Sequence, residues 1–177
     1  EFCTVLDRCE NRIGRMWECP DFFPVGDPDR NTRVLVISPQ DVTAEWPEFH
    51  NGNNALFLIG EYEKENHLFC RNRVQSADYG LDYYAPQAPD GRRILIAWMK
   101  SWDTNIFPEG FSWNGMTTVP REVSIREEDG RILQNPVREL ERYHGTPVCA
   151  EQVHVHEPVS FEGIRGRIAD LQVEIEG

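Results

Sequence analysis

Short apolar runs recur along this 177-residue chain, and turn-forming residues separate them. The clearest runs are RVLVIS (33–38), NALFLIGEY (54–62), NHLFCRNR (66–73) and RRILIAWM (92–99), followed by TVPREVSIRE (118–127) and GRILQNP (130–136). The segments between them, such as GDPDRN, HNGNN and EEDG, are rich in residues that form turns. Aromatic residues are spread over runs and turns without a helical period. The pattern predicts an all-β protein of the sandwich, barrel or propeller type.

One segment, QNPVRELERYHGTP, has a helical pattern. Asn135 is suited to cap a short helix that starts at Pro136, and its apolar stripe would comprise Val137, Leu140 and Tyr143. Beyond it, AEQVHVHEPVSF and RIADLQVEIEG alternate like strands with one solvated face. We therefore predict a connector with a short helix at 136–148, between a first unit at 1–135 and a second at 149–177.

The composition excludes some partners. The chain is 40% hydrophobic and has a net charge of -12, with 30 acidic residues against 18 Lys plus Arg. This balance argues against a nucleic-acid binder and against an anionic membrane surface, because both need a basic face. We find no signal-peptide pattern and no apolar run of membrane-spanning length. Five cysteines without CxxC spacing favour free thiols in a reducing compartment, hence a cytoplasmic rather than a secreted protein.

The stretch RMWECPDFFPVGD (15–27) places a carboxylate, Glu18, among apolar and aromatic residues. Pro20 favours an extended conformation of Cys19, which would give Glu18 a defined backbone. Aromatic walls would raise the pKa of a nearby carboxyl group, as a general acid requires near neutral pH. The alternative is a surface glutamate between core aromatic residues.

A second cluster is SADYGLDYYAPQ (76–87), in which Asp78 and Asp82 lie four residues apart. Tyr79, Tyr83 and Tyr84 stand between and after them. Carboxylates accept hydrogen bonds from sugar hydroxyls and aromatic rings cover apolar sugar faces, so the cluster suits a carbohydrate. The alternative is a turn followed by a strand whose tyrosines belong to the core.

Other candidate residues carry weaker signals. Trp98 ends a predicted strand, where a tryptophan is more often part of the core. His154 and His156 would share one face of a strand, but two histidines without a third ligand favour exposed residues over a metal site. The chain contains no phosphate-binding glycine loop, serine nucleophile elbow or zinc-binding helix motif.

Taken in order, these segments resemble glycoside hydrolase family 32, the group of invertase, sucrose-6-phosphate hydrolase, levanase and inulinase. MWECPDFF (16–23) resembles the family's ECP motif, and SPQ (38–40) the strand that follows it. DYGLDYYAPQ (78–87) resembles D-x-G-x-D-F-Y-A-x-Q, and GRRILIAWM (91–99) is similar to G-R-R-I-L-I-G-W-M. WNGMTTVPREV (113–123) and GRILQNPVREL (130–140) resemble the last two segments. The resemblance covers residues 14–141 with the motifs in the family's order.

The resemblance implies a five-bladed β-propeller followed by a β-sandwich. It also implies hydrolysis of a β-fructofuranosyl bond with retention by two carboxylates, without cofactor or metal. Glu18 matches the general acid/base, and Asp78 matches a position that supports this carboxyl and touches the sugar. Weaker candidates for lining the fructose pocket are Cys19, Asp82, Tyr84 and Trp98. The first expected substrate of the full enzyme is sucrose or sucrose 6-phosphate, and fructan is a further candidate substrate.

The chain also departs from the family. It contains neither the W-x-N-D-P-N-G motif with the nucleophile nor an R-D-P motif upstream of ECP. At about 40–45 residues per blade, residues 1–135 would form about three blades. We therefore expect the C-terminal part of a propeller and the first strands of a sandwich, inactive by themselves. The alternatives are a non-catalytic fructose- or fructan-binding module, and a chain that persists only by self-association through exposed sheet edges.

Overall fold

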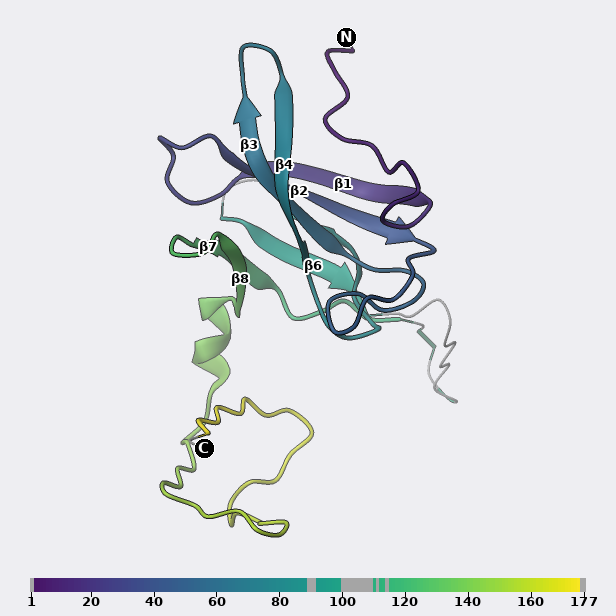
Figure 1. The fold of residues 1–177 in the computed structure, drawn as a ribbon. Coiled ribbons are helices and arrows are strands. Elements are labelled where there is room, and N and C mark those ends of the chain that lie inside the picture. The colour runs from purple at the N-terminus through teal and green to yellow at the C-terminus, as the bar shows by residue number, and fades with distance from the viewer. Residues whose placement is uncertain (1, 89–91, 100–109, 111, 114, 176–177) are drawn as a thin grey trace. The chain divides into compact units, whose positions relative to one another are not determined.

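The computed structural model describes residues 2–88, 92–99, 110, 112–113 and 115–175, which fall into two compact units, Glu1–Val137 and Arg138–Gly177 (Figure 1). The first unit contains two four-stranded antiparallel sheets, each with its strands in chain order. Sheet one comprises β1 (Met16–Pro24), β2 (Thr32–Gln40), β3 (Leu56–Glu63) and β4 (Leu68–Ser76). Sheet two comprises β5 (Tyr84–Gln87), β6 (Ile94–Trp98), β7 (Arg121–Arg126) and β8 (Arg131–Pro136). The predicted all-β fold is confirmed.

The number of blades differs from the prediction. The described part of residues 1–135 holds two four-stranded sheets instead of about three blades. Each sheet with its loops takes more than 45 residues, since one runs from 16 to 76 and the other from 84 to 136. Residues 2–15 contain no strand. Residues 2–15 and the stretches between β2 and β3 and between β6 and β7 therefore account for the chain that the count assigned to a third blade.

The central strands of sheet one are buried on both faces. In β2, Val34 and Val36 belong to one core cluster, whereas Leu35 and Ile37 belong to a second. Strand β3 divides its side chains in the same way, because successive residues of a strand point to opposite faces. The runs that predicted these strands are apolar throughout because neither face is solvated.

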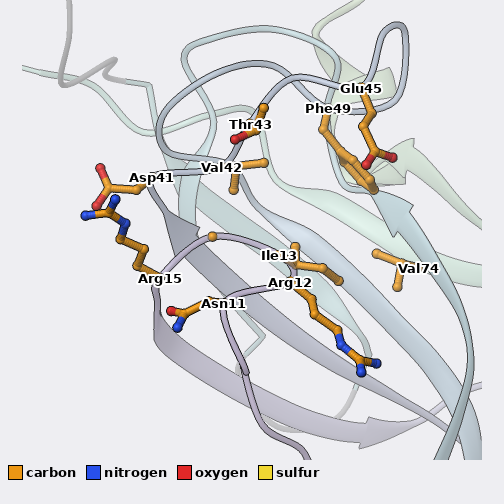
Figure 2. Close-up of a pocket in the computed structure, with 11 residues that line it drawn as sticks. Asn11, Arg12, Ile13, Arg15, Asp41, Val42, Thr43, Glu45, Phe49 and Val74 are labelled. Atoms are coloured by element: carbon orange, nitrogen blue, oxygen red, sulfur yellow. The ribbon is translucent and has the colours of Figure 1, made fainter.

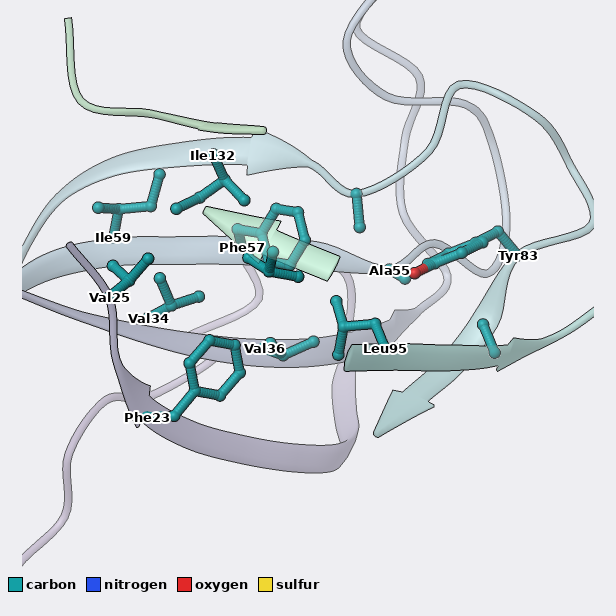
Figure 3. Packing of buried hydrophobic residues seen from close by; sticks show 13 residues of the cluster. Phe23, Val25, Val34, Val36, Ala55, Phe57, Ile59, Tyr83, Leu95 and Ile132 are labelled. Carbon is teal, nitrogen blue, oxygen red and sulfur yellow. The ribbon is translucent and has the colours of Figure 1, made fainter. Parts of the chain in front are cut away.

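The first of these clusters joins the two sheets (Figure 3). Phe57 of β3, Leu95 of β6 and Ile132 of β8 meet in it, and Phe57 and Leu95 are fully buried. Side-chain amides add bonds across the same junction. Gln75 Nε2 donates to the carbonyl of Ile132 at 2.8 Å and Gln75 Oε1 accepts from its N–H at 3.0 Å. These contacts hold sheet one, which contains β1, against sheet two, which contains β5, and the site described below draws on both strands.

The second unit is described by itself. It begins with a 3-10 helix at Arg138–Tyr143, within the segment predicted to hold a short helix. Val137 is buried but Tyr143 is 71% exposed, so the predicted stripe forms only in part. Residues 144–175 contain no strand, in contrast to the two predicted segments, and His154 and His156 are exposed there. Even the two predicted strands would not make a stable sheet by themselves. The assignment of 149–177 to a sandwich therefore stays a prediction. Among the described residues, none of the helices has the length and apolar character to cross a membrane.

Candidate active site

The site is built around Glu18, a half-buried residue near the start of β1. Its Oε2 accepts two hydrogen bonds, one from the Tyr84 hydroxyl at 2.8 Å and one from Gln40 Nε2 at 2.7 Å. Tyr84 begins β5 in sheet two and is 5% exposed, whereas Gln40 ends β2 in sheet one. The two predicted clusters, 15–27 and 76–87, are therefore brought together at one carboxylate.

A β-bulge follows each member of the Glu18–Tyr84 pair. The strand register shifts between Glu18 and Asp21 in β1 and between Tyr84 and Gln87 in β5. Cys19 and Ala85 have left-handed backbones, with φ of 48° and 51°. Such residues cost about 1–3 kcal/mol each and gather at functional sites, because the surrounding structure must hold them.

The backbone conformation of Cys19 differs from the prediction. A residue before proline favours an extended backbone, but Cys19 is left-handed because the bulge imposes that conformation. Its carbonyl accepts a hydrogen bond from Gln87 Nε2 at 2.9 Å, which links the two bulges directly. The Cys19 side chain is exposed. The two sheets are thus tied together beside Glu18 through a main-chain atom.

Gly14 helps to place Gln40. The amide of Arg15 donates to the Gln40 carbonyl at 2.9 Å, so the segment before β1 continues the pairing with β2. Gly14 has a φ of +72°, and a Cβ at this position would overlap the same carbonyl oxygen. Only glycine therefore lets the chain approach Gln40 this closely.

The surroundings of Glu18 differ from the predicted aromatic walls. Trp17 and Phe22 pack against the second core cluster, and Phe23 belongs to the first. Trp17 Nε1 donates to the Ile13 carbonyl at 2.8 Å. Glu18 is instead held by a phenol and an amide, because alternation along β1 turns its aromatic neighbours to other contacts.

Asp78 lies in the loop after β4 as part of a charged pair. Its Oδ2 is 2.7 Å from Arg121 Nη1, and its Oδ1 accepts the N–H of Gly80 at 2.7 Å. The Arg121 guanidinium also lies 4.7 Å from the centre of the Tyr83 ring. The ion pair with Arg121 thus ties the Asp78 side chain to β7. Asp82, in the same loop as Asp78, is exposed.

Two of the three tyrosines are core residues, as in the alternative considered for this segment. Tyr83 is 2% exposed and donates to Gln134 Oε1 at 3.3 Å. Tyr79, at 60% exposure, is the one whose ring is open to a ligand. The aromatic face predicted for the segment is therefore reduced to Tyr79.

Burial raises the pKa of Tyr83 from 10.0 to about 12, and it also raises the pKa of Tyr84. The stabilisation from keeping Tyr83 neutral is complete below the unfolded pKa near 10 and is lost as the pH rises through 12. We expect the free energy of unfolding to fall between pH 10 and 12, by up to about 1.4 kcal/mol per pH unit for each such tyrosine. Urea denaturation at several pH values measures this slope.

Tyr83→Phe removes one of these titrating groups. The free energy of unfolding should then fall less steeply between pH 10 and 12, by the contribution of one proton. Tyr143→Phe is the control, since Tyr143 is exposed. An unchanged slope in Tyr83→Phe would show that ionisation of this residue is not opposed by folding.

Trp98 lies beside the Glu18–Tyr84 pair. It is the register partner of Tyr84 across β5 and β6, so the two side chains leave the sheet on the same face. Trp98 is 55% exposed, and Gly115 lies under its ring. An indole held at a strand end with an open face is suited to contact an apolar sugar face.

A pocket of about 950 Å³ lies between the segment before β1 and the loop after β2 (Figure 2). Its described lining includes Arg12, Arg15 and Asp41 but not Glu18 or Tyr84. Ile13 and Phe49 in its wall also pack against the second core cluster, on the Trp17 side of β1. We assign the candidate site from the hydrogen bonds around Glu18, since neither Glu18 nor Tyr84 lines this pocket.

Sequence reasoning missed several residues of this site, chiefly Gln40, Gln87 and Arg121. The motif SPQ contains Gln40, and its resemblance to the family was the only available signal. Arg121 belongs to the VPREV segment, where no local pattern points to Asp78. Among the described residues, no group of three or more His, Cys, Asp or Glu could hold a metal ion.

Comparison with known proteins decides the family. The model of the glycosyl hydrolases family 32 N-terminal domain matches residues 1–136. The chain belongs to glycoside hydrolase family 32. The resemblance found in the sequence is thereby confirmed, and the two sheets are blades of a family 32 propeller domain.

Two curated proteins of Escherichia coli are similar to the chain. Raffinose invertase is 38% identical over 157 residues, which are 80% of this chain and 32% of that protein. Sucrose-6-phosphate hydrolase is 36% identical over 143 residues, 79% of this chain and 29% of that protein. The chain thus spans about a third of the length of these curated relatives.

The solved family 32 β-fructofuranosidase BmSUC1 of Bombyx mori has a similar fold. It superposes with a TM-score of 0.72 at 32% identity, over 84% of this chain and 32% of that one. A mutant of BmSUC1 has also been solved in complex with sucrose. This family 32 chain therefore shares both sequence and fold with β-fructofuranosidases.

Proposed function

We propose that this family 32 chain carries the general acid/base of a retaining β-fructofuranosidase, and that Glu18 is that group. The observation that carries the proposal is the anchoring of one carboxylate oxygen. Oε2 accepts the bonds from Tyr84 and Gln40, and among the described residues no hydrogen bond reaches Oε1. A carboxyl with one oxygen held and one open has the geometry of a proton donor to a bound substrate.

In this mechanism Glu18 acts twice. As an acid it gives its proton to the glycosidic oxygen while a second carboxylate attacks the anomeric carbon of fructose, which forms a covalent fructosyl ester. As a base it then takes a proton from water, and the water oxygen attacks the same carbon to release fructose with retained configuration. The second carboxylate would come from the W-x-N-D-P-N-G segment of the family, which this sequence does not contain.

We propose positioning and binding roles for the neighbouring candidates. Tyr84 orients Glu18 through its hydroxyl, and Trp98 offers its exposed ring on the same face of sheet two. Asp78 is held by Arg121 close to the chain segment that carries Tyr84, and exposed Asp82 is a candidate acceptor for sugar hydroxyls. The exposed Cys19 stays a candidate for the pocket wall.

The substrate proposed for the whole protein is sucrose or sucrose 6-phosphate. Support comes from the relatives named sucrose-6-phosphate hydrolase and raffinose invertase, and from the neighbour solved with sucrose. A cytoplasmic location and self-association through exposed sheet edges stay predictions.

The isolated 177-residue chain is expected to hydrolyse neither sucrose nor an aryl fructoside, because a retaining mechanism needs a nucleophile that its sequence lacks. Release of glucose or of the aryl alcohol, measured over many hours, tests this. Turnover that disappears in Glu18→Gln would contradict the expected inactivity. Binding of fructans without turnover would agree with the alternative of a non-catalytic binding module.

A further inference from the structure

Two β-bulges flank the hydrogen bond between Glu18 and Tyr84, one on each side of the junction between the sheets. Strands β1 and β5 are each an edge strand of their own sheet, and they contact one another there. A bulge leaves one residue out of the regular strand pairing, so its backbone groups need partners from elsewhere. At these bulges the left-handed residues Cys19 and Ala85 directly follow Glu18 and Tyr84. Whatever holds the two bulges therefore also holds this pair.

Ser38 holds the bulge of β5 from the other sheet. It is fully buried in β2, where it is the register partner of Glu18. Its Oγ accepts the N–H of Ala85 at 3.1 Å, and its carbonyl accepts the Tyr84 hydroxyl at 3.4 Å. One residue of sheet one therefore bonds both the bulge residue of β5 and the tyrosine that precedes it.

Gln87 makes the reciprocal bond from sheet two. Its Nε2 donates to the carbonyl of Cys19 at 2.9 Å, so a side chain of β5 holds the bulge of β1. A second bond joins the same two segments, since Asp21 Oδ2 accepts the N–H of Ala88 at 2.9 Å. Each bulge is thus bonded by a side chain that belongs to the opposite sheet.

The position of the Glu18 carboxyl depends on both bulges. The 2.8 Å bond from Tyr84 to Glu18 Oε2 spans the two sheets, and each of its ends is one residue from a left-handed backbone. A bulge that relaxed to regular pairing would turn the neighbouring side chains toward the other face of the sheet. Glu18 would then lose the phenol that orients it, and a misplacement of about 1 Å can slow an enzymatic step by about 10²-fold.

We propose that Ser38 and Gln87 are positioning residues for the acid/base, because they hold the two bulges that aim Glu18 and Tyr84 at one another. The inference rests on the proposed function, since it takes Glu18 as the proton donor. Neither Ser38 nor Gln87 transfers a proton, because each acts through the backbone of a bulge residue. Loss of either bond is expected to slow the hydrolytic step and to leave substrate binding in place.

A carbon-13 spectrum of the 177-residue chain with labelled tyrosine rings tests the positioning without any need for turnover. The chain has five tyrosines, and the phenol carbon of Tyr84 is assigned by its absence in Tyr84→Phe. Its signal reports the hydrogen bond of the phenol, and is expected to shift or broaden in Ser38→Ala and in Gln87→Leu. Gln75→Leu is the matched control, because Gln75 also bonds the other sheet, but joins β4 to Ile132 of β8. It should lower the stability in urea and leave the Tyr84 signal in place.

The kinetic consequence is measured in a protein that joins this chain to the nucleophile segment of family 32. Ser38→Ala and Gln87→Leu are expected to lower kcat on sucrose by about 3- to 30-fold with KM within about two-fold of its native value, and Gln75→Leu should leave both unchanged. An unmoved Tyr84 signal in the folded variants, an equal shift in Gln75→Leu, or a loss confined to KM would overturn the proposal. Failure of the proposed function is read separately. Glu18→Gln would then keep the kcat of the joined protein, while the tyrosine spectrum still decides whether Ser38 and Gln87 hold the bulges.

Discussion

Glu18→Gln is expected to lower kcat on sucrose by roughly 10²- to 10⁴-fold in a protein that joins this chain to the nucleophile segment of family 32. The substitution keeps the size of the side chain, and Tyr84 can still donate to its amide oxygen. What is lost is the proton for the leaving oxygen and the base for water. Steady-state kinetics on sucrose and on an aryl fructoside with a good leaving group would measure it. The aryl substrate should be less affected in the first step, since its leaving group needs no proton.

Glu61→Gln is the control for Glu18→Gln. Glu61 lies in the half of β3 that pairs with the start of β2, away from the end of the sheet that carries Glu18. The Glu61→Gln substitution should therefore leave kcat unchanged. A change confined to KM in Glu18→Gln would assign Glu18 to substrate binding instead. Equal losses on both substrates would argue against proton donation to the leaving group.

Phe57→Ala is expected to lower the free energy of unfolding by about 3–5 kcal/mol, which is a large part of the stability of an ordinary domain. Phe57 is fully buried in the cluster that joins the two sheets, so its removal opens a cavity at their junction (Figure 3). Urea denaturation would show the midpoint moving to lower concentration with little change in m.

Phe2→Ala makes the same chemical change at a residue that is 80% exposed, and should shift stability by less than about 0.5 kcal/mol. Because the cluster draws on both sheets, they should unfold in one transition. Two separate transitions in the native chain, or a loss near that of Phe2→Ala, would show that the sheets are independent.

Strands β2 and β3 were predictable because a strand that is buried on both faces has an uninterrupted run of apolar residues in the sequence. RVLVIS and NALFLIGEY became β2 and β3, whose alternate residues enter different core clusters. Strand β1 was less visible, since Pro20 and Pro24 interrupt it and a bulge shifts its register. The strands predicted after residue 148 do not form in the described part of the second unit, because alternation favours a strand only where a partner strand exists.

The candidate site was predictable only in part. Glu18 and the residues of segment 76–87 were recognisable as candidate site residues from their types and neighbours. The resemblance of these segments to family 32, in the family's order, assigned both to one hydrolysis reaction. Nothing local indicated that Tyr84 donates to Glu18, or that Tyr83 is buried and Tyr79 is open. The contact of Tyr84 depends on which face of β5 meets the neighbouring sheet, and a one-residue bulge reverses that face. Tyr79 and Tyr83 lie outside the strands, so the path of the loop between β4 and β5 decides which of the two rings is buried.

The sequence by itself determined the all-β class, the family and the identity of the candidate acid/base, because periodicity and ordered motifs are local properties of a chain. Only the tertiary structure decided that two sheets share one core, that Cys19 and Ala85 adopt left-handed backbones, and that Tyr84 and Gln40 share one oxygen of Glu18. Those contacts to Glu18 join residues 22 and 66 positions apart. Their energies depend on packing between strands, which no local pattern encodes.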